Sequence, residues 1–220
     1  MTNQLRSIRR GPDRPERAVV LLPGYGDRPE PFLDRAAQFD PDGRWLVVVV
    51  EPQHPSDRGP FWYDVDDNGP NPVDLAAAIA ATDALCGALL AETDRTPDDL
   101  VIAGFSQGGA IALAHFVDPT AAVQPSAVAT LSGYLPTRDD TLIDLTRATH
   151  RPVLFVHGED DDLVEPVRGR SAARAIHRSG GLVSWHEVSG GHRFDLPITS
   201  KLALWLDALA RGDQPHSPPI

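Results

Sequence analysis

A Gly-x-Ser-x-Gly pattern lies at residues 104–108, with Ser106 at its centre, between an apolar run and a helix-like run at 107–117. A serine on a sharp strand-to-helix turn exposes its hydroxyl above the sheet edge, where it can attack an electrophile. The flanking glycines permit a backbone that larger side chains would block. The first N–H groups of the helix would favour negative charge at the same place. The alternative is a glycine-rich turn without chemistry, so the rest of the sequence must decide.

A serine hydroxyl needs a base within hydrogen-bond reach and a third group that orients this base. On a parallel sheet with such a turn, the parts follow in the order serine, acid, histidine, each after a strand. Three adjacent aspartates, residues 160–162, follow the predicted strand at 153–156, and His192 follows the predicted strand at 182–188. Both loops leave the same edge of the sheet as Ser106, where parallel α/β folds bind ligands. The spacing alone does not choose among the three aspartates.

Eight histidines compete for the role of base. His192 is favoured, because it follows the last strand and a glycine pair lets it turn towards Ser106. His157 precedes the acid, so we expect it to support its own loop through a hydrogen bond. The other six lie in predicted strands or helices, in the tail, or in loops that follow the wrong strand: His54, His115, His150, His177, His186 and His216.

Acyl transfer puts negative charge on a carbonyl oxygen, and two backbone N–H groups commonly hold it. Gln107, the residue after Ser106, would supply one of them. The loop after the first long strand, at residues 23–27, would supply the other, and Tyr25 is the best placed. A phosphate-binding turn at Gly24-x-Gly26 is the rival interpretation. It lacks the third glycine of a dinucleotide site and the lysine of a P-loop, so we discount it.

With these segments together, the chain resembles the carboxylesterase/phospholipase branch of the α/β-hydrolases, which includes acyl-protein thioesterases. The nucleophile segment of this family, Gly-Phe-Ser-Gln-Gly-Gly, is matched at residues 104–109, and its His-Gly-x-x-Asp segment at 157–161. The second match implies that Asp161 is the acid. Trp62 and Tyr63 match a family element near the acyl pocket, which implies contact with substrate. The chain departs from the family at Pro23, where a histidine is usual, and this leaves the natural substrate open.

Short β-branched runs alternate with longer alanine- and leucine-rich runs, which predicts a mostly parallel sheet with helices on both faces. The expected fold class is α/β, an α/β-hydrolase fold without a separate lid domain. Residues 1–212 would form one domain, and residues 213–220 a flexible tail. The predicted strands are 18–22, 45–50, 100–103, 127–131, 153–156 and 182–188, with a weaker one at 4–9. The predicted helices are 31–38, 72–92, 107–117, 166–178 and 198–210.

The net charge of −11 argues against nucleic-acid and anionic-membrane partners, which need clustered basic residues. No segment is judged apolar enough to span a membrane, and the first ten residues lack the apolar run of a secretory signal. A cytoplasmic location is therefore expected. The single cysteine, Cys86, excludes an internal disulfide and is expected to be a small core residue. No metal-site spacing is present, so we expect no metal.

The expected function is a serine hydrolase that cleaves small-molecule esters or thioesters without a cofactor. Ser106 would be the nucleophile, His192 the base and Asp161 the acid. One alternative is a dienelactone-hydrolase-like enzyme, although that family normally has a cysteine nucleophile. Another is a hydrolase-fold binding protein without turnover. The sequence does not distinguish a monomer from a homodimer, and it does not give the acyl length or the leaving group.

Overall fold

The computed structural model describes residues 5–138 and 143–216. Within these residues, a central sheet has the strand order β1-β3-β2-β6-β7-β8-β9. β1 is antiparallel to β3, and the other neighbours are parallel. The strands are β1 Ser7–Arg10, β2 Arg17–Leu22, β3 Trp45–Val50, β6 Leu100–Phe105, β7 Ala127–Leu131, β8 Pro152–Gly158 and β9 Leu182–Val188.

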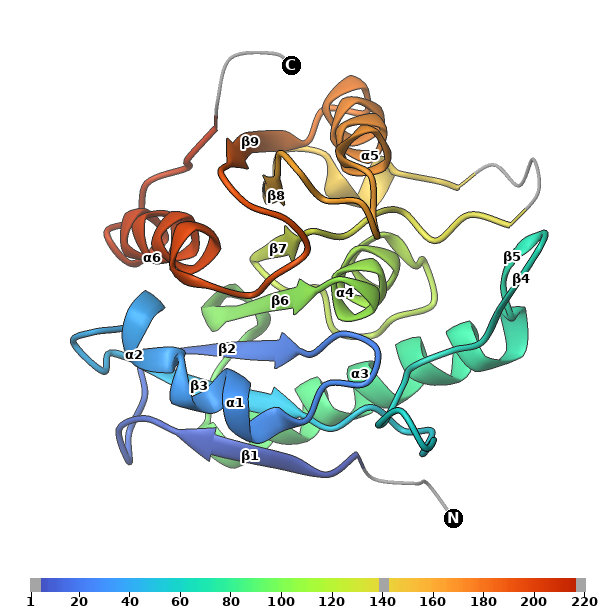
Figure 1. The fold of residues 1–220 in the computed structure, drawn as a ribbon. Helices are drawn as coiled ribbons and strands as arrows, with labels where there is room; N and C mark the ends of the chain where they lie inside the picture. The colour runs from blue at the N-terminus through green and yellow to red at the C-terminus, as the bar shows by residue number, and fades with distance from the viewer. Residues whose placement is uncertain (1–4, 139–142, 217–220) are drawn as a thin grey trace.

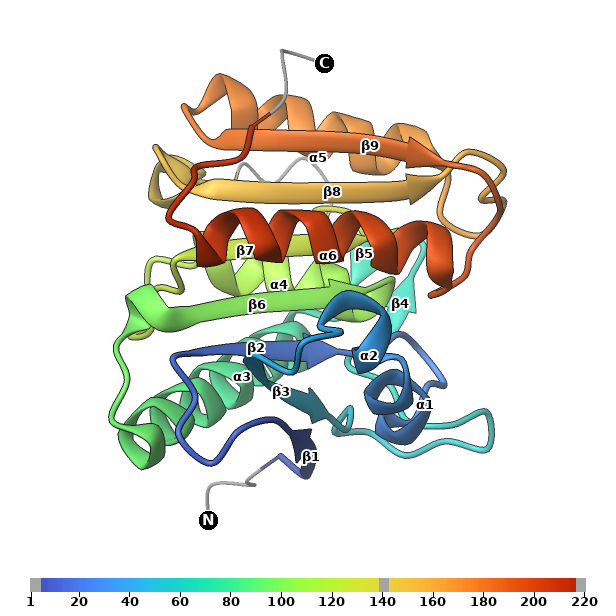
Figure 2. The same cartoon turned by 90° about the vertical axis from the view of Figure 1, so that its left-hand side faces the viewer.

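Helices cover both faces of this sheet (Figures 1 and 2). They are α1 Pro29–Asp34, α2 Ala36–Phe39, α3 Pro72–Thr93, α4 Gln107–Val117, α5 Pro166–Arg178 and α6 Leu196–Ala210. Figure 2 shows α1, α2 and α6 in front of the sheet and α3, α4 and α5 behind it. The predicted mostly parallel sheet with helices on both faces is confirmed.

The alternation of side chains along the strands divides the core into two apolar layers. In β2, Val20 and Leu22 pack against the α3, α4 and α5 side. Val19 and Leu21 pack against the α1, α2 and α6 side. The strand is buried on both faces, as a central parallel strand must be. The carboxyl ends of the parallel strands therefore meet at one rigid edge, and this edge positions the candidate site.

The six main strand predictions are confirmed to within two residues at each end. The weaker strand predicted at 4–9 forms at Ser7–Arg10, and residue 4 lies outside the described residues. The single helix predicted at 31–38 is wrong, because two short helices form there. At Arg35 the backbone N–H bonds to the carbonyl of Leu33, only two residues earlier, so the α-helical ladder of four-residue bonds stops. A hairpin of β4 (Val65–Asp66) and β5 (Gly69–Pro70) was not predicted, since two-residue strands carry no periodicity.

The prediction that no segment is apolar enough to span a membrane is wrong for α3 by length and composition. This helix has 22 residues and a mean hydropathy of 1.7 over its most apolar window. A core helix of a globular fold passes the same test, so the observation is weak evidence for a membrane span. In this structure Ala78, Cys86 and Leu89 of α3 pack into the core beneath the sheet. The burial of Cys86 confirms its predicted place in the core.

Of the predicted tail at 213–220, the last four residues lie outside the described residues. Residues 213–216 form no helix or strand. The hydroxyl of Ser184 in β9 donates a hydrogen bond to the carbonyl of Pro215 at 3.1 Å. Part of the predicted tail therefore lies against the last strand of the sheet.

Candidate active site

Ser106 lies on a strained turn between β6 and α4. Its φ of 54° and ψ of −120° are rare for a residue with a side chain. A Cβ on Gly104 would lie 2.2 Å from the carbonyl oxygen of Gly108, and a Cβ on Gly108 would lie 2.1 Å from that of Leu22. Both positions must therefore be glycine. The close approach of these backbones aims the Ser106 side chain out of the carboxyl edge of the sheet.

His192 joins Ser106 to Asp161. Its Nε2 lies 2.8 Å from the Oγ of Ser106, and its Nδ1 lies 2.7 Å from the Oδ2 of Asp161. A carboxylate that accepts from Nδ1–H leaves the lone pair of Nε2 facing the serine hydroxyl. Asp161 is buried, whereas the side chains of Asp160 and Asp162 are exposed. The structure thus brings together the three residues predicted as nucleophile, base and acid.

The loop of Asp161 is held by its own backbone and by His157. The Oδ1 of Asp161 accepts from the N–H groups of Leu163 and Val164, at 3.1 and 2.8 Å. The Nε2–H of His157 donates to the carbonyl of Val164 at 2.7 Å, which confirms the predicted support of this loop. Burial lowers the pKa of His157, although the Val164 carbonyl and Asp161 oppose this shift. Gly169 lets α5 approach, because a Cβ there would lie 2.7 Å from the Nδ1 of His157.

The loop after β2 lies directly against the serine. A Cβ on Gly24 would lie 3.1 Å from the Cβ of Ser106. Within the described residues, neither the N–H of Tyr25 nor that of Gln107 has a hydrogen-bond partner in the protein. Unpaired N–H groups beside a nucleophile are the feature an oxyanion site requires. The Tyr25 ring itself is exposed and stacks on Phe61 with a centroid distance of 5.5 Å.

Trp62 and Tyr63, predicted to contact substrate, are buried in this structure. Both side chains are buried, with 0% and 1% of their surface exposed, so neither offers a surface to a ligand in this structure. The Nε1–H of Trp62 donates to the carbonyl of Pro23 at 2.7 Å. The side-chain amide of Gln107 accepts from the Trp62 N–H at 2.8 Å and donates to the Tyr63 carbonyl at 2.7 Å. These residues support the site instead of lining it.

Sequence reasoning missed the aromatic packing of the base. The ring of Phe105 lies 4.8 Å from that of His192, centroid to centroid, and also contacts Phe32 and Phe194. Phe194 stacks on Phe32 at 4.5 Å. The only signal was their position in the sequence: Phe105 directly precedes Ser106, and Phe194 lies two residues after His192. One face of the His192 imidazole therefore packs against an aromatic cluster.

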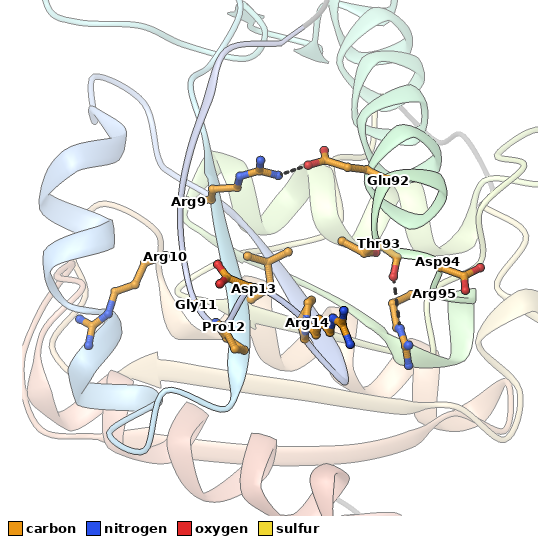
Figure 3. Close-up of a pocket in the computed structure, with 12 residues that line it drawn as sticks. Arg9, Arg10, Gly11, Pro12, Asp13, Arg14, Glu92, Thr93, Asp94 and Arg95 are labelled. Carbon is orange, nitrogen blue, oxygen red and sulfur yellow. Dashed lines mark hydrogen bonds and ion pairs between the residues drawn. The ribbon is translucent and has the colours of Figure 1, made fainter.

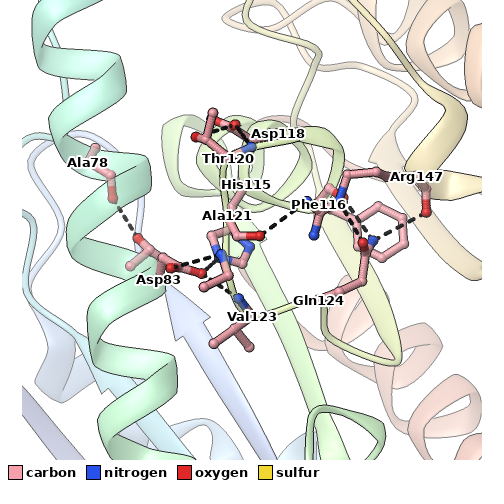
Figure 4. Close-up of polar contacts among 12 residues, drawn as sticks. Ala78, Asp83, His115, Phe116, Asp118, Thr120, Ala121, Val123, Gln124 and Arg147 are labelled. Carbon is pink, nitrogen blue, oxygen red and sulfur yellow. Dashed lines mark hydrogen bonds and ion pairs between the residues drawn. The ribbon is translucent and has the colours of Figure 1, made fainter.

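A second Asp–His pair lies elsewhere in the fold (Figure 4). The Nε2 of His115 in α4 lies 3.1 Å from the Oδ1 of Asp83 in α3. The carboxylate of Asp83 also accepts from the N–H groups of Ala122 and Val123, at 3.1 and 2.9 Å. Burial and the charge of Asp83 raise the pKa of the nearby thiol of Cys86, which is buried. The pair therefore links α3 to α4 and to the loop that follows α4.

A hollow of about 540 Å³ lies near the end of α3, away from Ser106 (Figure 3). Four arginines and three carboxylate residues line it: Arg9, Arg10, Arg14, Arg95, Asp13, Glu92 and Asp94. Arg9 is paired with Glu92 at 2.6 Å, and Arg10 extends away from the other arginines. The charges nearly cancel, so the hollow does not rival the edge near Ser106 as a ligand site. Within the described residues, no group of three potential metal ligands occurs.

Comparison with known proteins places the chain in a family. A family model described as phospholipase/carboxylesterase matches residues 3–206. A rice protein (Oryza sativa subsp. japonica) named "probable inactive carboxylesterase" is 30% identical over 182 residues, covering 74% of this chain and 72% of its own. The "acyl-protein thioesterase 1 homolog 1" of Dictyostelium discoideum is 30% identical over 166 residues, covering 69% and 72%.

Solved structures share the fold at lower identity. A carboxylesterase from Mesorhizobium loti superposes with a TM-score of 0.77 at 18% identity, covering 94% of this chain and 97% of that one. An identity this low supports the shared fold alone. The family match, in contrast, extends over nearly the whole sequence. The chain therefore belongs to the phospholipase/carboxylesterase family and has the α/β-hydrolase fold.

Proposed function

We propose that this chain hydrolyses small-molecule carboxylic esters or thioesters through an acyl-enzyme on Ser106. The observation that supports it most is the position of His192, within 2.8 Å of the Ser106 hydroxyl and 2.7 Å of the Asp161 carboxylate. Family membership gives a carboxylesterase or thioesterase type of hydrolase. The roles of individual residues rest on the geometry of this chain.

The reaction proceeds in two halves. The Oγ of Ser106 attacks the acyl carbon while its proton moves to the Nε2 of His192. The tetrahedral intermediate then collapses, and the departing alcohol or thiol takes this proton. Water then attacks the acyl-enzyme while His192 takes its proton. The second tetrahedral intermediate collapses to the free acid, and His192 returns the proton to the Oγ of Ser106. Every proton is returned, and no step requires a cofactor or a metal.

Asp161, Tyr25 and Gln107 act on charge that develops during these steps. The carboxylate of Asp161 holds the imidazole in the required tautomer and stabilises its charged form. The N–H groups of Tyr25 and Gln107 are free to bind the oxyanion. Donors that are already in place cost no reorganisation when the charge appears. Trp62 and Tyr63 are assigned to the support of this oxyanion site.

A hydrolase-fold binding protein without turnover is the second candidate, because one relative carries a name that calls it inactive. A dienelactone-hydrolase-like activity is disfavoured by Ser106 in the place of a cysteine. The cytoplasmic location and the choice between monomer and homodimer stay predictions. Turnover of a panel of nitrophenyl esters and acyl thioesters would give the preferred acyl-chain length and leaving group.

The decisive experiment is labelling with a fluorophosphonate probe together with turnover of a short nitrophenyl ester. We expect the parent protein to be labelled at Ser106 and to turn over. Ser106→Ala should lose the label and about 10⁴-fold or more of kcat, with its Tm unchanged. Ser189→Ala, which removes an exposed hydroxyl near His192, should behave as the parent. A parent that neither labels nor turns over any member of the panel would support the binding-protein alternative.

A further inference from the structure

The turn at residues 24–27 is closed from both sides by Asp27. The N–H of Asp27 donates to the carbonyl of Gly24 at 3.3 Å. The N–H of Gly24 donates back to the Oδ2 of Asp27 at 3.2 Å. Gly26, at φ 80°, adopts the left-handed backbone that the third position of such a turn requires. Backbone and carboxylate of one residue thus fix both ends of the turn.

These bonds decide which N–H group of the turn is available. That of Gly24 is taken by Asp27, that of Gly26 by the carbonyl of Pro60 at 2.8 Å, and that of Asp27 by Gly24. Of the four N–H groups in this turn, only that of Tyr25 has no partner among the described residues. The amide that carries this N–H also carries the Gly24 carbonyl, so the bond from Asp27 polarises it and strengthens its donor.

The turn has no freedom to shift without disturbing Ser106. A Cβ built on Gly24 would lie 2.8 Å from the Oδ2 of Asp27 and 3.1 Å from the Cβ of Ser106. On the outer side, a Cβ on Gly59 would lie 2.3 Å from the carbonyl oxygen of Gly26. Gly24 therefore lies between the carboxylate and the nucleophile, and the carboxylate determines how it is oriented.

The charges that face Asp27 come from two other parts of the fold. His192 follows β9, and Arg35 lies between α1 and α2. Burial raises the pKa of the Asp27 carboxyl, and the Gly24 N–H, His192 and Arg35 oppose this shift. The charges of His192 and Arg35 therefore act on the same carboxylate that accepts from the Gly24 N–H.

We propose that Asp27 is a positioning residue for the oxyanion site, whose carboxylate fixes the turn so that the N–H of Tyr25 faces the acyl oxygen. This inference rests on the proposed function of Ser106. Asp27 touches no reacting atom. Its effect passes through the Gly24–Tyr25 amide.

The test compares Asp27→Ala with Asp27→Asn. The alanine removes the acceptor for the Gly24 N–H, whereas the asparagine keeps a carbonyl oxygen there and removes only the charge. We expect Asp27→Ala to lower kcat by about 10- to 100-fold with little change in KM, the cost of a displaced oxyanion donor. Asp27→Asn should keep kcat within about threefold of the parent.

Binding of an alkylboronic acid gives a second measurement. Its tetrahedral adduct on Ser106 places an oxygen where the oxyanion forms, so its affinity for Asp27→Ala should fall in parallel with kcat. Asp57→Ala is the matched control, since it removes an exposed carboxylate from a neighbouring loop. It should leave kcat and boronate affinity unchanged. Measured Tm values identify any variant that is merely unfolded.

Parental kcat in Asp27→Ala would overturn the proposal, as would equal losses in the folded alanine and asparagine variants. Unchanged boronate affinity alongside a low kcat would also overturn it. These outcomes differ from a failure of the proposed function, in which the parent protein itself would show no turnover that depends on Ser106.

Discussion

The indole N–H of Trp62 donates to the carbonyl of Pro23 across 2.7 Å, and both groups are buried. The adjoining backbone of Trp62 and Tyr63 is bound by the side chain of Gln107. One segment thus ties the loop after β2 to the first turn of α4. These are the two places that carry the N–H groups proposed to hold the oxyanion.

Trp62→Phe tests this support against the predicted contact with substrate. The variant leaves the Pro23 carbonyl buried without its donor, and an unsatisfied buried group costs about 1–3 kcal/mol. We expect a lower Tm and a several-fold lower kcat, equal for short and long acyl chains. The measurement is kcat and KM over a graded ester panel. A change confined to KM, or to one chain length, would favour direct contact between Trp62 and the acyl group.

The three adjacent aspartates give a sharp test of the acid. Asp161→Asn should reduce kcat by about 10⁴-fold, because the amide favours the wrong imidazole tautomer. Asp160→Asn and Asp162→Asn remove exposed charges from the same loop and should stay near the parent. All three variants change the net charge equally, so they control for one another. If a neighbour proves to be the costly position, the assignment of Asp161 is wrong.

The sequence predicted the order of the site residues and the sheet that carries them, because both depend on local patterns. Residue order along a parallel sheet sufficed to bring Ser106 and His192 to one edge. The contacts of Gln107 with Trp62 and Tyr63 were not foreseen. They join a side chain to backbone groups 45 and 44 residues away, and a backbone partner can be any residue type. Asp27 was missed for a similar reason, because its partner is the backbone of Gly24.

Two glycine substitutions test how tightly the strand-to-helix turn is packed. In Gly108→Ala the new Cβ would lie 2.1 Å from the Leu22 carbonyl oxygen and 2.4 Å from that of Pro23. Both are backbone atoms at the end of β2 that cannot move away, so we expect a large fall in Tm and in activity. In Gly87→Ala, on α3, the Cβ would meet only the Cγ2 of Val123, at 3.8 Å.

The Gly87→Ala variant should therefore gain about 0.5–1 kcal/mol, the usual difference between alanine and glycine inside a helix. Thermal or urea unfolding of the two variants beside the parent gives both values. A Gly108→Ala protein with parental Tm and kcat would show that the end of β2 and the start of α4 have room for a methyl group between them.

The buried pair of His115 and Asp83 predicts a loss of stability in mild acid. His115 is fully buried, and its Nδ1 has no hydrogen-bond partner among the described residues, so a second N–H would find no acceptor. Burial lowers the pKa of His115, although Asp83 opposes the shift. As the pH falls through ~6.5, the ordinary histidine pKa, the unfolded chain binds a proton at this residue while the folded protein does not.

Stability linked to His115 is therefore present above pH ~6.5 and is lost as the pH falls towards the lowered folded value, by up to about 1.4 kcal/mol per pH unit. Burial also lowers the pKa of His157 and His186, which add to the loss.

In His115→Gln, an amide that cannot take up a proton replaces the imidazole. The variant should be less stable than the parent at pH 7.5 but lose less between pH 7.5 and 5.5. His177→Gln, on the exposed side of α5, is the control and should follow the parent. Urea unfolding at the two pH values measures the difference, and equal losses in the parent and His115→Gln would rule out the contribution of this pair.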